Sequence, residues 1–140
     1  MKLQEVMTQN IEFITADSTV CDAAVKMASR DVGFLPVVED RSPAGVITDR
    51  DIVIRCIAQG EDPRQTPVSR AMTPAIEIMN QEDSVEEAAR LMKEKQIRRL
   101  MVVDSERRLV GVVALGDLAV DAADPQLTGE TLEGVSQGTH

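Results

Sequence analysis

The feature that most constrains the fold of this chain is an internal repeat. When the sequence is shifted by 65 residues, Met7-Thr8 falls on Met72-Thr73. The same shift superimposes an ordered series of apolar positions: Val20, Ala23, Ala24, Met27, Leu35, Val37 and Val38 on Val85, Ala88, Ala89, Met92, Leu100, Val102 and Val103. With one extra residue in a turn, Gly45 then falls on Gly111. Matches in this order over about 45 residues indicate a tandem duplication.

Each half of the duplication predicts the same elements. Thr19-x-x-Asp22 and Ser84-x-x-Glu87 are typical of capping boxes, and apolar residues follow each of them at helical spacing. Continuously apolar stretches then predict buried strands. The expected elements are helices from Val20 and Val85, strands at 34–38, 44–47, 100–103 and 109–113, and second helices at about 49–58 and 115–122.

These elements give a strand–helix–strand–strand–helix order in each half and predict an α+β fold. A unit of about 50 residues cannot bury both faces of its sheet alone. We therefore expect an α/β sandwich in which the two repeats pack sheet to sheet, with pseudo-twofold symmetry and clefts between them. The predicted boundaries are repeat 1 at 1–58, a Pro-, Gly- and charge-rich linker at 59–69, repeat 2 at 70–122 and a flexible tail at 123–140.

Composition argues against several functions. A net charge of −9 disfavours binding to nucleic acid or to an anionic membrane surface. We expect no leader segment, because no charged-then-apolar stretch opens the sequence, and no membrane-spanning helix, because no apolar run approaches the ~18 residues that one needs. Two cysteines are too few for a disulfide framework, so we expect a cytoplasmic protein. With a single His and scattered acids, no catalytic constellation is present, and we expect no enzyme.

The most informative motif is the run GVITDRD at residues 45–51, with a weaker echo, GVVALGD, at 111–117. Only the first run keeps a hydroxyl, Thr48, three residues ahead of its Asp51. This spacing is typical of a capping box. A carboxylate in that position can also accept hydrogen bonds from a cis-diol, because the cap leaves lone pairs unused. The residues alone leave both interpretations open.

Together, the segments DVGFLPVVED, IRRLMVVD, GVITDRDI and GVVALGDL resemble a tandem pair of CBS domains, a Bateman module of the stand-alone prokaryotic type. The resemblance extends over about Val6 to Ala119. It implies a regulatory module that needs no cofactor and binds AMP, ADP, ATP or S-adenosylmethionine in the clefts between its repeats. In this family's signature, Gly-apolar-apolar-Thr/Ser-x-x-Asp, the Asp binds the ribose hydroxyls and the hydroxyl side chain assists.

Carried over to this sequence, the resemblance implies that Thr48 and Asp51 contact the ribose. Arg98 and Arg99, which precede an apolar strand of the opposite repeat, would contact the phosphates. The apolar slot for adenine would come from residues that can equally be core: Val46, Ile76, Ile78 and Leu100. The second cleft would collect residues that supply neither a hydroxyl nor a cation: Asp117, Ala114, Gly33 and Phe34. We therefore expect one nucleotide site and one degenerate cleft.

The leading hypothesis is a sensor in which an adenine nucleotide shifts the packing of the two halves and signals to an effector protein. The alternative is a ligand-free dimerisation or protein-interaction module. A zinc or redox site through Cys21, Cys56 and His140 is a third interpretation, but it lacks C-x-x-C spacing. We also expect a homodimer that forms through the Ala- and Met-bearing helices.

Overall fold

The computed structural model describes residues 1–74, 77–116 and 118, and it divides the chain into two compact units. The first-repeat unit comprises Glu12–Ile76. The second-repeat unit combines Met1–Ile11 with Glu77–His140. This division differs from the predicted boundaries, which placed the N-terminal segment with the first repeat. None of the described helices is long and apolar enough to cross a membrane.

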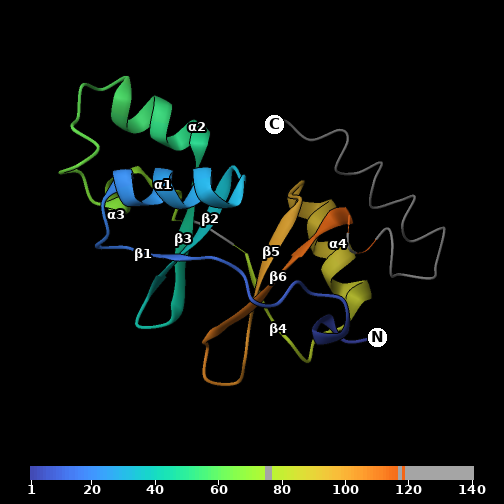
Figure 1. Ribbon diagram of the computed structural model, residues 1–140. Helices are drawn as coiled ribbons and strands as arrows, with labels where there is room; N and C mark the ends of the chain where they lie inside the picture. The colour runs from blue at the N-terminus through green and yellow to red at the C-terminus, as the bar shows by residue number, and fades with distance from the viewer. Residues whose placement is uncertain (75–76, 117, 119–140) are drawn as a thin grey trace. The chain divides into compact units, whose positions relative to one another are not determined.

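The first-repeat unit is built on a three-stranded sheet in the order β1-β2-β3. Strand β1 pairs with β2 in parallel, and β2 pairs with β3 as an antiparallel hairpin. Figure 1 shows α1 crossing β2 and β3, with α2 beside it. The elements are β1 (Ile14–Thr15), α1 (Val20–Arg30), β2 (Phe34–Glu39), β3 (Ser42–Thr48), α2 (Asp49–Ile52), the π-helical turn η2 (Val53–Ile57) and α3 (Val68–Ala71).

The second-repeat unit repeats this topology with a sheet in the order β4-β5-β6. Here β4 and β5 are parallel, and β5 and β6 are antiparallel. The elements are the 3₁₀ turn η1 (Leu3–Glu5), β4 (Ile78–Asn80), α4 (Val85–Lys95), β5 (Arg99–Val103) and β6 (Leu109–Ala114). The predicted α+β class is therefore confirmed, with one three-stranded sheet in each unit. The packing of one sheet on the other stays a prediction.

The helices begin where the capping patterns predict. The Thr19 hydroxyl accepts from the Asp22 N–H at 3.1 Å, and the Asp22 carboxylate accepts from the Thr19 N–H at 3.2 Å. Ser84 caps α4 through one bond, from the Glu87 N–H at 3.1 Å. The predicted apolar faces are buried in the core of each unit, including Ala23 and Met27 in α1 and Ala88, Ala89 and Met92 in α4.

The second helix of the first repeat differs from its prediction in one respect. Its first turn, α2, is α-helical, but the chain then widens into the π-helical turn η2. The Ala58 N–H donates to the carbonyl of Val53, five residues back, at 2.8 Å. Of the corresponding helix predicted at 115–122, Leu115, Gly116 and Leu118 are described and are helical. The predicted tail at 123–140 lies outside the described residues.

The segment predicted as a linker, 59–69, is bonded into the first-repeat unit. The Cys21 N–H at the start of α1 donates to the Pro63 carbonyl at 2.9 Å. Thr66 is only 5% exposed, and its hydroxyl donates to the Asp62 carbonyl at 2.8 Å. The segment is therefore part of the unit, and the chain does not leave the unit until it has passed α3.

Two segments, which we call the lead-ins, open the two repeats: residues 1–8 and residues 66–73. Each lead-in bonds to the repeat that it does not open in sequence. The backbone bonds correspond one to one under the 65-residue shift: Val85 N–H to Met1 O and Val20 N–H to Thr66 O, both 2.9 Å, and Leu3 N–H to Asp83 O and Val68 N–H to Ser18 O, 2.9 and 2.7 Å. The lead-ins are therefore swapped between the repeats.

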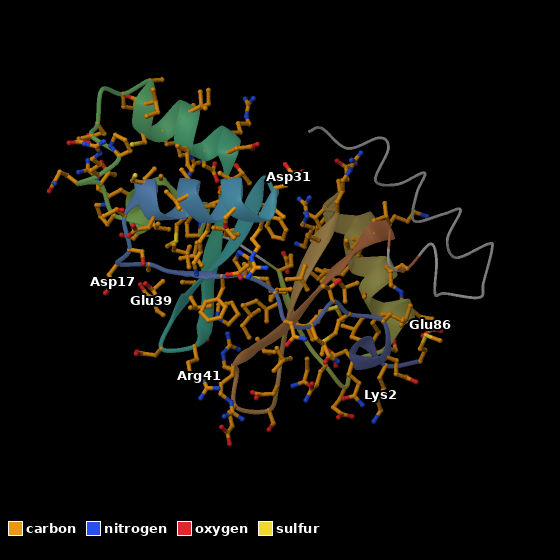
Figure 2. The ribbon with its side chains drawn as sticks, viewed as in Figure 1. Lys2, Asp17, Asp31, Glu39, Arg41 and Glu86 are labelled. Atoms are coloured by element: carbon orange, nitrogen blue, oxygen red, sulfur yellow. The ribbon has the colours of Figure 1, made fainter. Side chains whose placement is uncertain are left out.

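The N-terminal lead-in is held to its unit by buried and charged side chains. Leu3 is fully buried and Val6 is 7% exposed. Figure 2 shows Lys2 beside the first turn of α4, which carries Glu86. The Lys2 ammonium donates to the Glu82 carboxylate, and this hydrogen bond raises the pKa of Lys2. The lead-in is therefore an integral part of the second-repeat unit.

The swap explains the repeated glycines. Thr73 pairs with Val46 of β3, and Thr8 pairs with Val112 of β6. The neighbouring Gly45 and Gly111 lie directly beneath the crossing lead-in. A Cβ on Gly45 would lie 2.5 Å from the Thr73 carbonyl oxygen and 3.1 Å from the Met72 sulfur. Close backbone approach, and not a special backbone angle, is the reason for glycine here.

We expect Gly45→Ala to destabilise the protein by about 1–3 kcal/mol, because the added methyl group forces apart a hydrogen-bonded backbone. Gly111→Ala should cost less, since its nearest contact, at 2.6 Å, is the flexible Met7 sulfur. Gly116→Ala, with nothing within 4 Å, is the control. Urea unfolding measures all three, and a greater loss for Gly111→Ala than for Gly45→Ala would contradict this account.

Candidate functional site

The candidate site begins where β3 ends and α2 begins. Thr48 has extended backbone and is the N-cap of α2. Its hydroxyl accepts from the Asp51 N–H at 3.0 Å, and Asp51 Oδ2 accepts from the Thr48 N–H at 3.0 Å. Asp51 is 9% exposed and is one of two polar residues in the described buried set, with Thr66. The capping interpretation of Thr48-x-x-Asp51 is therefore confirmed.

The cap leaves part of the Asp51 carboxylate available. Oδ2 is occupied by the cap, whereas Oδ1 lies 3.8 Å from Nε of Arg55. That distance is too long for a hydrogen bond. A carboxylate has about four lone-pair positions, so Oδ1 can still accept from the hydroxyls of a ligand. Capping and ligand binding are therefore compatible roles for Asp51.

Arg55 is a residue that the sequence analysis missed. It lies one helical turn after Asp51, and Nη1 of its guanidinium donates to the Met72 carbonyl at 2.9 Å. The signal in the sequence was the i,i+4 spacing of an acid and a base, which places both side chains on one helix face. A cation of the same repeat therefore lies next to the Asp51 carboxylate and is bonded to the backbone of Met72.

The predicted adenine slot is described only in part. Val46 is half-buried on β3, and its backbone is bonded in both directions to Thr73. Ile78, the first residue of β4, is also half-buried. Leu100 is fully buried in the core of the second-repeat unit, which is the position of a packing residue. Ile76 lies outside the described residues.

The predicted phosphate contacts belong to the other compact unit. Arg98 is exposed, and its carbonyl accepts from the Leu115 N–H at 2.9 Å. Arg99 is the exposed first residue of β5, in register with Ala114. The structure thus places the arginine pair at one end of the β5-β6 hairpin. Both nucleotide binding at Asp51 and a contact of these arginines with its phosphates stay predictions.

The second predicted cleft lacks the features of the first. Ala114 ends β6, as Thr48 ends β3, and has no hydroxyl to cap the next turn. Phe34 lies in register with Thr48, and the Gly33 carbonyl accepts from the Asp49 N–H at 2.9 Å. Gly33 and Phe34 therefore adjoin the first site in their own unit. Asp117 lies outside the described residues.

A metal site finds no support in the part of the chain that the structure describes, where no three His, Cys, Asp or Glu residues are grouped to hold an ion. Cys21 and Cys56 are free thiols. Cys56 is buried, and its thiol donates to the Glu61 carbonyl at 3.6 Å. His140, the third predicted ligand, lies outside the described residues.

Comparison with known proteins identifies the repeats. The family model described as "CBS domain" matches twice, at residues 3–57 and 68–122. The CBS domain-containing protein YhcV of Bacillus subtilis (strain 168) is 42% identical over 134 residues, which are 96% of this chain and 94% of that protein. Hypoxic response protein 1 of Mycobacterium tuberculosis is 34% identical over 117 residues, 83% of this chain and 81% of that protein.

Two solved structures share the fold. The crystal structure of Hypoxic Response Protein I with two coordinated zinc ions has a TM-score of 0.77 and 32% identity, covering 86% of this chain and 98% of that one. The crystal structure of CBSX2 in complex with AMP has a TM-score of 0.73 and 27% identity, covering 86% of this chain and 95% of that one. These neighbours support the predicted fold of each repeat.

We expect Thr48→Ala to destabilise the protein by about 1 kcal/mol, the usual effect of removing a helix cap. Thr19→Ala, which removes the matching cap of α1, should have a similar effect. Urea unfolding measures both losses of stability, provided that the m-values of the two variants equal that of the wild-type protein. An unchanged stability in Thr48→Ala would show that its capping bonds do not contribute to folding.

Proposed function

The chain belongs to the CBS-domain family as a tandem pair, and from this premise we propose that it is a regulatory module that binds an adenine nucleotide at Asp51. The observation that carries the proposal is a nearly buried carboxylate with one oxygen used by the cap and the other, Oδ1, paired with Arg55 only at 3.8 Å. The AMP complex of the similar CBSX2 structure supports an adenine nucleotide as the ligand class.

In the proposed complex, a ribose hydroxyl donates to Oδ1 of Asp51 while Oδ2 keeps its bond to Thr48. Arg98 and Arg99 supply charge-assisted bonds to the phosphate from the second repeat. The half-buried Val46 and Ile78 contribute apolar surface to the adenine slot, and Ile76, two residues before Ile78, is a further residue proposed for it. The phosphate thus provides the attraction, and the diol provides the specificity for a nucleoside.

The two repeats are not equivalent in this proposal. The first has Thr48 at the end of its strand and the second has Ala114. Before the apolar strand, the second has Arg98-Arg99 and the first has Gly33-Phe34. If the partners cross between repeats, the hydroxyl and both arginines gather in the Asp51 cleft, and the Asp117 cleft has neither a hydroxyl nor a cation. We therefore propose a single nucleotide site.

The proposed output is a change in a partner protein, since the match to the CBS domain-containing protein YhcV covers 94% of that relative and leaves little of it outside the CBS pair. A nucleotide can shift only an equilibrium between states for which its affinity differs. We propose that those states are two arrangements of the repeats, which an effector protein distinguishes. The cytoplasm is the compartment that we propose, because Cys21 and Cys56 are free thiols.

We also propose a homodimer, but through a different face from the one expected from the sequence. The Ala and Met side chains of α1 and α4 lie mainly in the cores of their own units. Three of the exposed large apolar side chains in the described part of the chain lie instead on the single turn η2: Val53 (55%), Ile54 (46%) and Ile57 (53%). A second copy of the chain, bringing the same apolar surface, is the occupant that we propose for this face.

Calorimetric titration tests the ligand proposal. At least one of AMP, ADP, ATP and S-adenosylmethionine should bind and raise the melting temperature, because a ligand of the folded state stabilises it. Silence from all four at millimolar concentration would contradict the sensor and favour the ligand-free interaction module.

Paired aspartate variants test the site. Asp51→Ala and Asp22→Ala remove the same acid from two matched capping boxes, so each should cost about 1 kcal/mol of stability. Only Asp51→Ala should abolish nucleotide binding, and Asp117→Ala should leave it nearly intact. Arg99→Ala should weaken AMP far more than adenosine, since it removes a charge-assisted contact to phosphate. Full affinity in Asp51→Ala would reduce its role to the cap.

Light scattering tests the dimer. The wild-type protein should have twice the monomer mass of 15.3 kDa at micromolar concentration, and the double variant Ile54→Lys/Ile57→Lys should return the monomer mass. Phe13→Lys, an exposed apolar residue just before β1, is the control and should stay dimeric. A monomeric wild-type protein, or a double variant that stays dimeric, would refute this interface.

A further inference from the structure

The segment by which the chain leaves the first-repeat unit is fixed to the strand that carries the candidate site. Met72-Thr73, which we call the connector, follows α3 and leads toward Glu77 of the second-repeat unit. The Val46 N–H donates to the Thr73 carbonyl at 3.0 Å, and the Thr73 N–H donates to the Val46 carbonyl at 2.8 Å. Because β3 ends two residues later at Thr48, the connector and the cap share one strand.

Arg55 adds a second link between the same two places. Nη1 of its guanidinium donates to the Met72 carbonyl at 2.9 Å, next to the Val46–Thr73 pair. Nε of the same group lies 3.8 Å from Oδ1 of Asp51, the oxygen that the cap does not use. One planar cation therefore lies between the open oxygen of the site and the backbone of the connector. The Asp51 side chain is 12% exposed, so this attraction is only partly screened by water.

We propose that Arg55 is a positioning residue that couples occupancy of the Asp51 carboxylate to the connector. The inference rests on the proposed nucleotide site and specifies how its occupancy would be transmitted. A ligand hydroxyl on Oδ1 fixes the carboxylate, and the fixed carboxylate holds the guanidinium in the orientation that bonds Met72. Opening of the connector must then break both the Arg55 bond and the Val46–Thr73 pair, so ligand binding makes opening rarer.

The sequence limits this device to the first repeat. With the 66-residue offset that aligns Asp51 with Asp117, the position of Arg55 falls on Asp121. An acid there cannot donate to the carbonyl of the N-terminal lead-in. The difference between Arg55 and Asp121 favours the first repeat, as does the difference between Thr48 and Ala114. The repeat with the hydroxyl also has the cation that links its aspartate to a lead-in.

Hydrogen exchange of the Thr73 amide tests the coupling, because that N–H is bonded across the connector. AMP should slow exchange of this amide in the wild-type protein by about fivefold, the lower end of typical allosteric couplings. In Arg55→Gln, AMP should still bind by calorimetry, but the Thr73 rate should no longer respond. Arg70→Gln, which removes an arginine paired with Glu61 at 3.3 Å, is the matched control and should respond as the wild type does.

A double-mutant cycle of Asp51→Asn and Arg55→Gln, measured by hydrogen exchange without AMP, separates this inference from the proposed function. Asp51→Asn keeps an oxygen for the cap but removes the charge facing Arg55. It should speed exchange of the Thr73 amide in the wild-type background and have no effect in the Arg55→Gln background. Equal effects in both backgrounds would overturn the link. Loss of AMP binding in Arg55→Gln would also overturn it, since Arg55 would then be a ligand contact. If AMP fails to bind the wild-type protein, the proposed function fails, and the cycle alone decides the role of Arg55.

Discussion

The swap of the two lead-ins is the interaction on which the rest of this structure depends. Each repeat supplies a sheet and a capped helix, and each is completed by backbone bonds from the segment that opens the other repeat. The requirement is strictest at Gly45, where the backbone of the lead-in leaves no room for a side chain, and weaker at Gly111, where the nearest atoms belong to the flexible Met7 side chain. The duplication is therefore a structural necessity as well as a sequence pattern, because the repeats complete one another.

The candidate site depends on the same contacts. The strand that pairs with the connector ends in Thr48, and the capping box fixes Asp51 within the first turn of α2. A cap orients a carboxylate at little cost, since one oxygen is held while the other stays open. Ligand binding at Oδ1 of Asp51 would therefore not require the capping hydrogen bonds to break. It uses a side chain that folding has already placed, and the cation one turn later connects that side chain to the connector.

Much of this could be predicted from the sequence, because the signals were local. Capping boxes, apolar helix faces and buried strands each depend on neighbouring residues, and Thr19, Thr48 and Ser84 cap helices as expected. The swap could not be predicted, because spacing along the chain does not reveal which strand a lead-in crosses. Gly45 and Gly111 were its signal, but a glycine that follows a turn can equally be explained by the permissive backbone that the turn needs. The π-helical turn has no clear signature in Val53–Ile57, and Arg55 is an ordinary basic residue until Met72 is placed beside it.

The central claim is that one carboxylate serves both the cap and a nucleotide. A crystal structure of the protein grown with AMP tests it most directly. The account predicts a ribose hydroxyl within about 2.8 Å of Oδ1 of Asp51, an ordinary hydrogen bond, while both Thr48–Asp51 bonds remain. AMP bound away from Asp51, or bound there only after the capping bonds are broken, would contradict it.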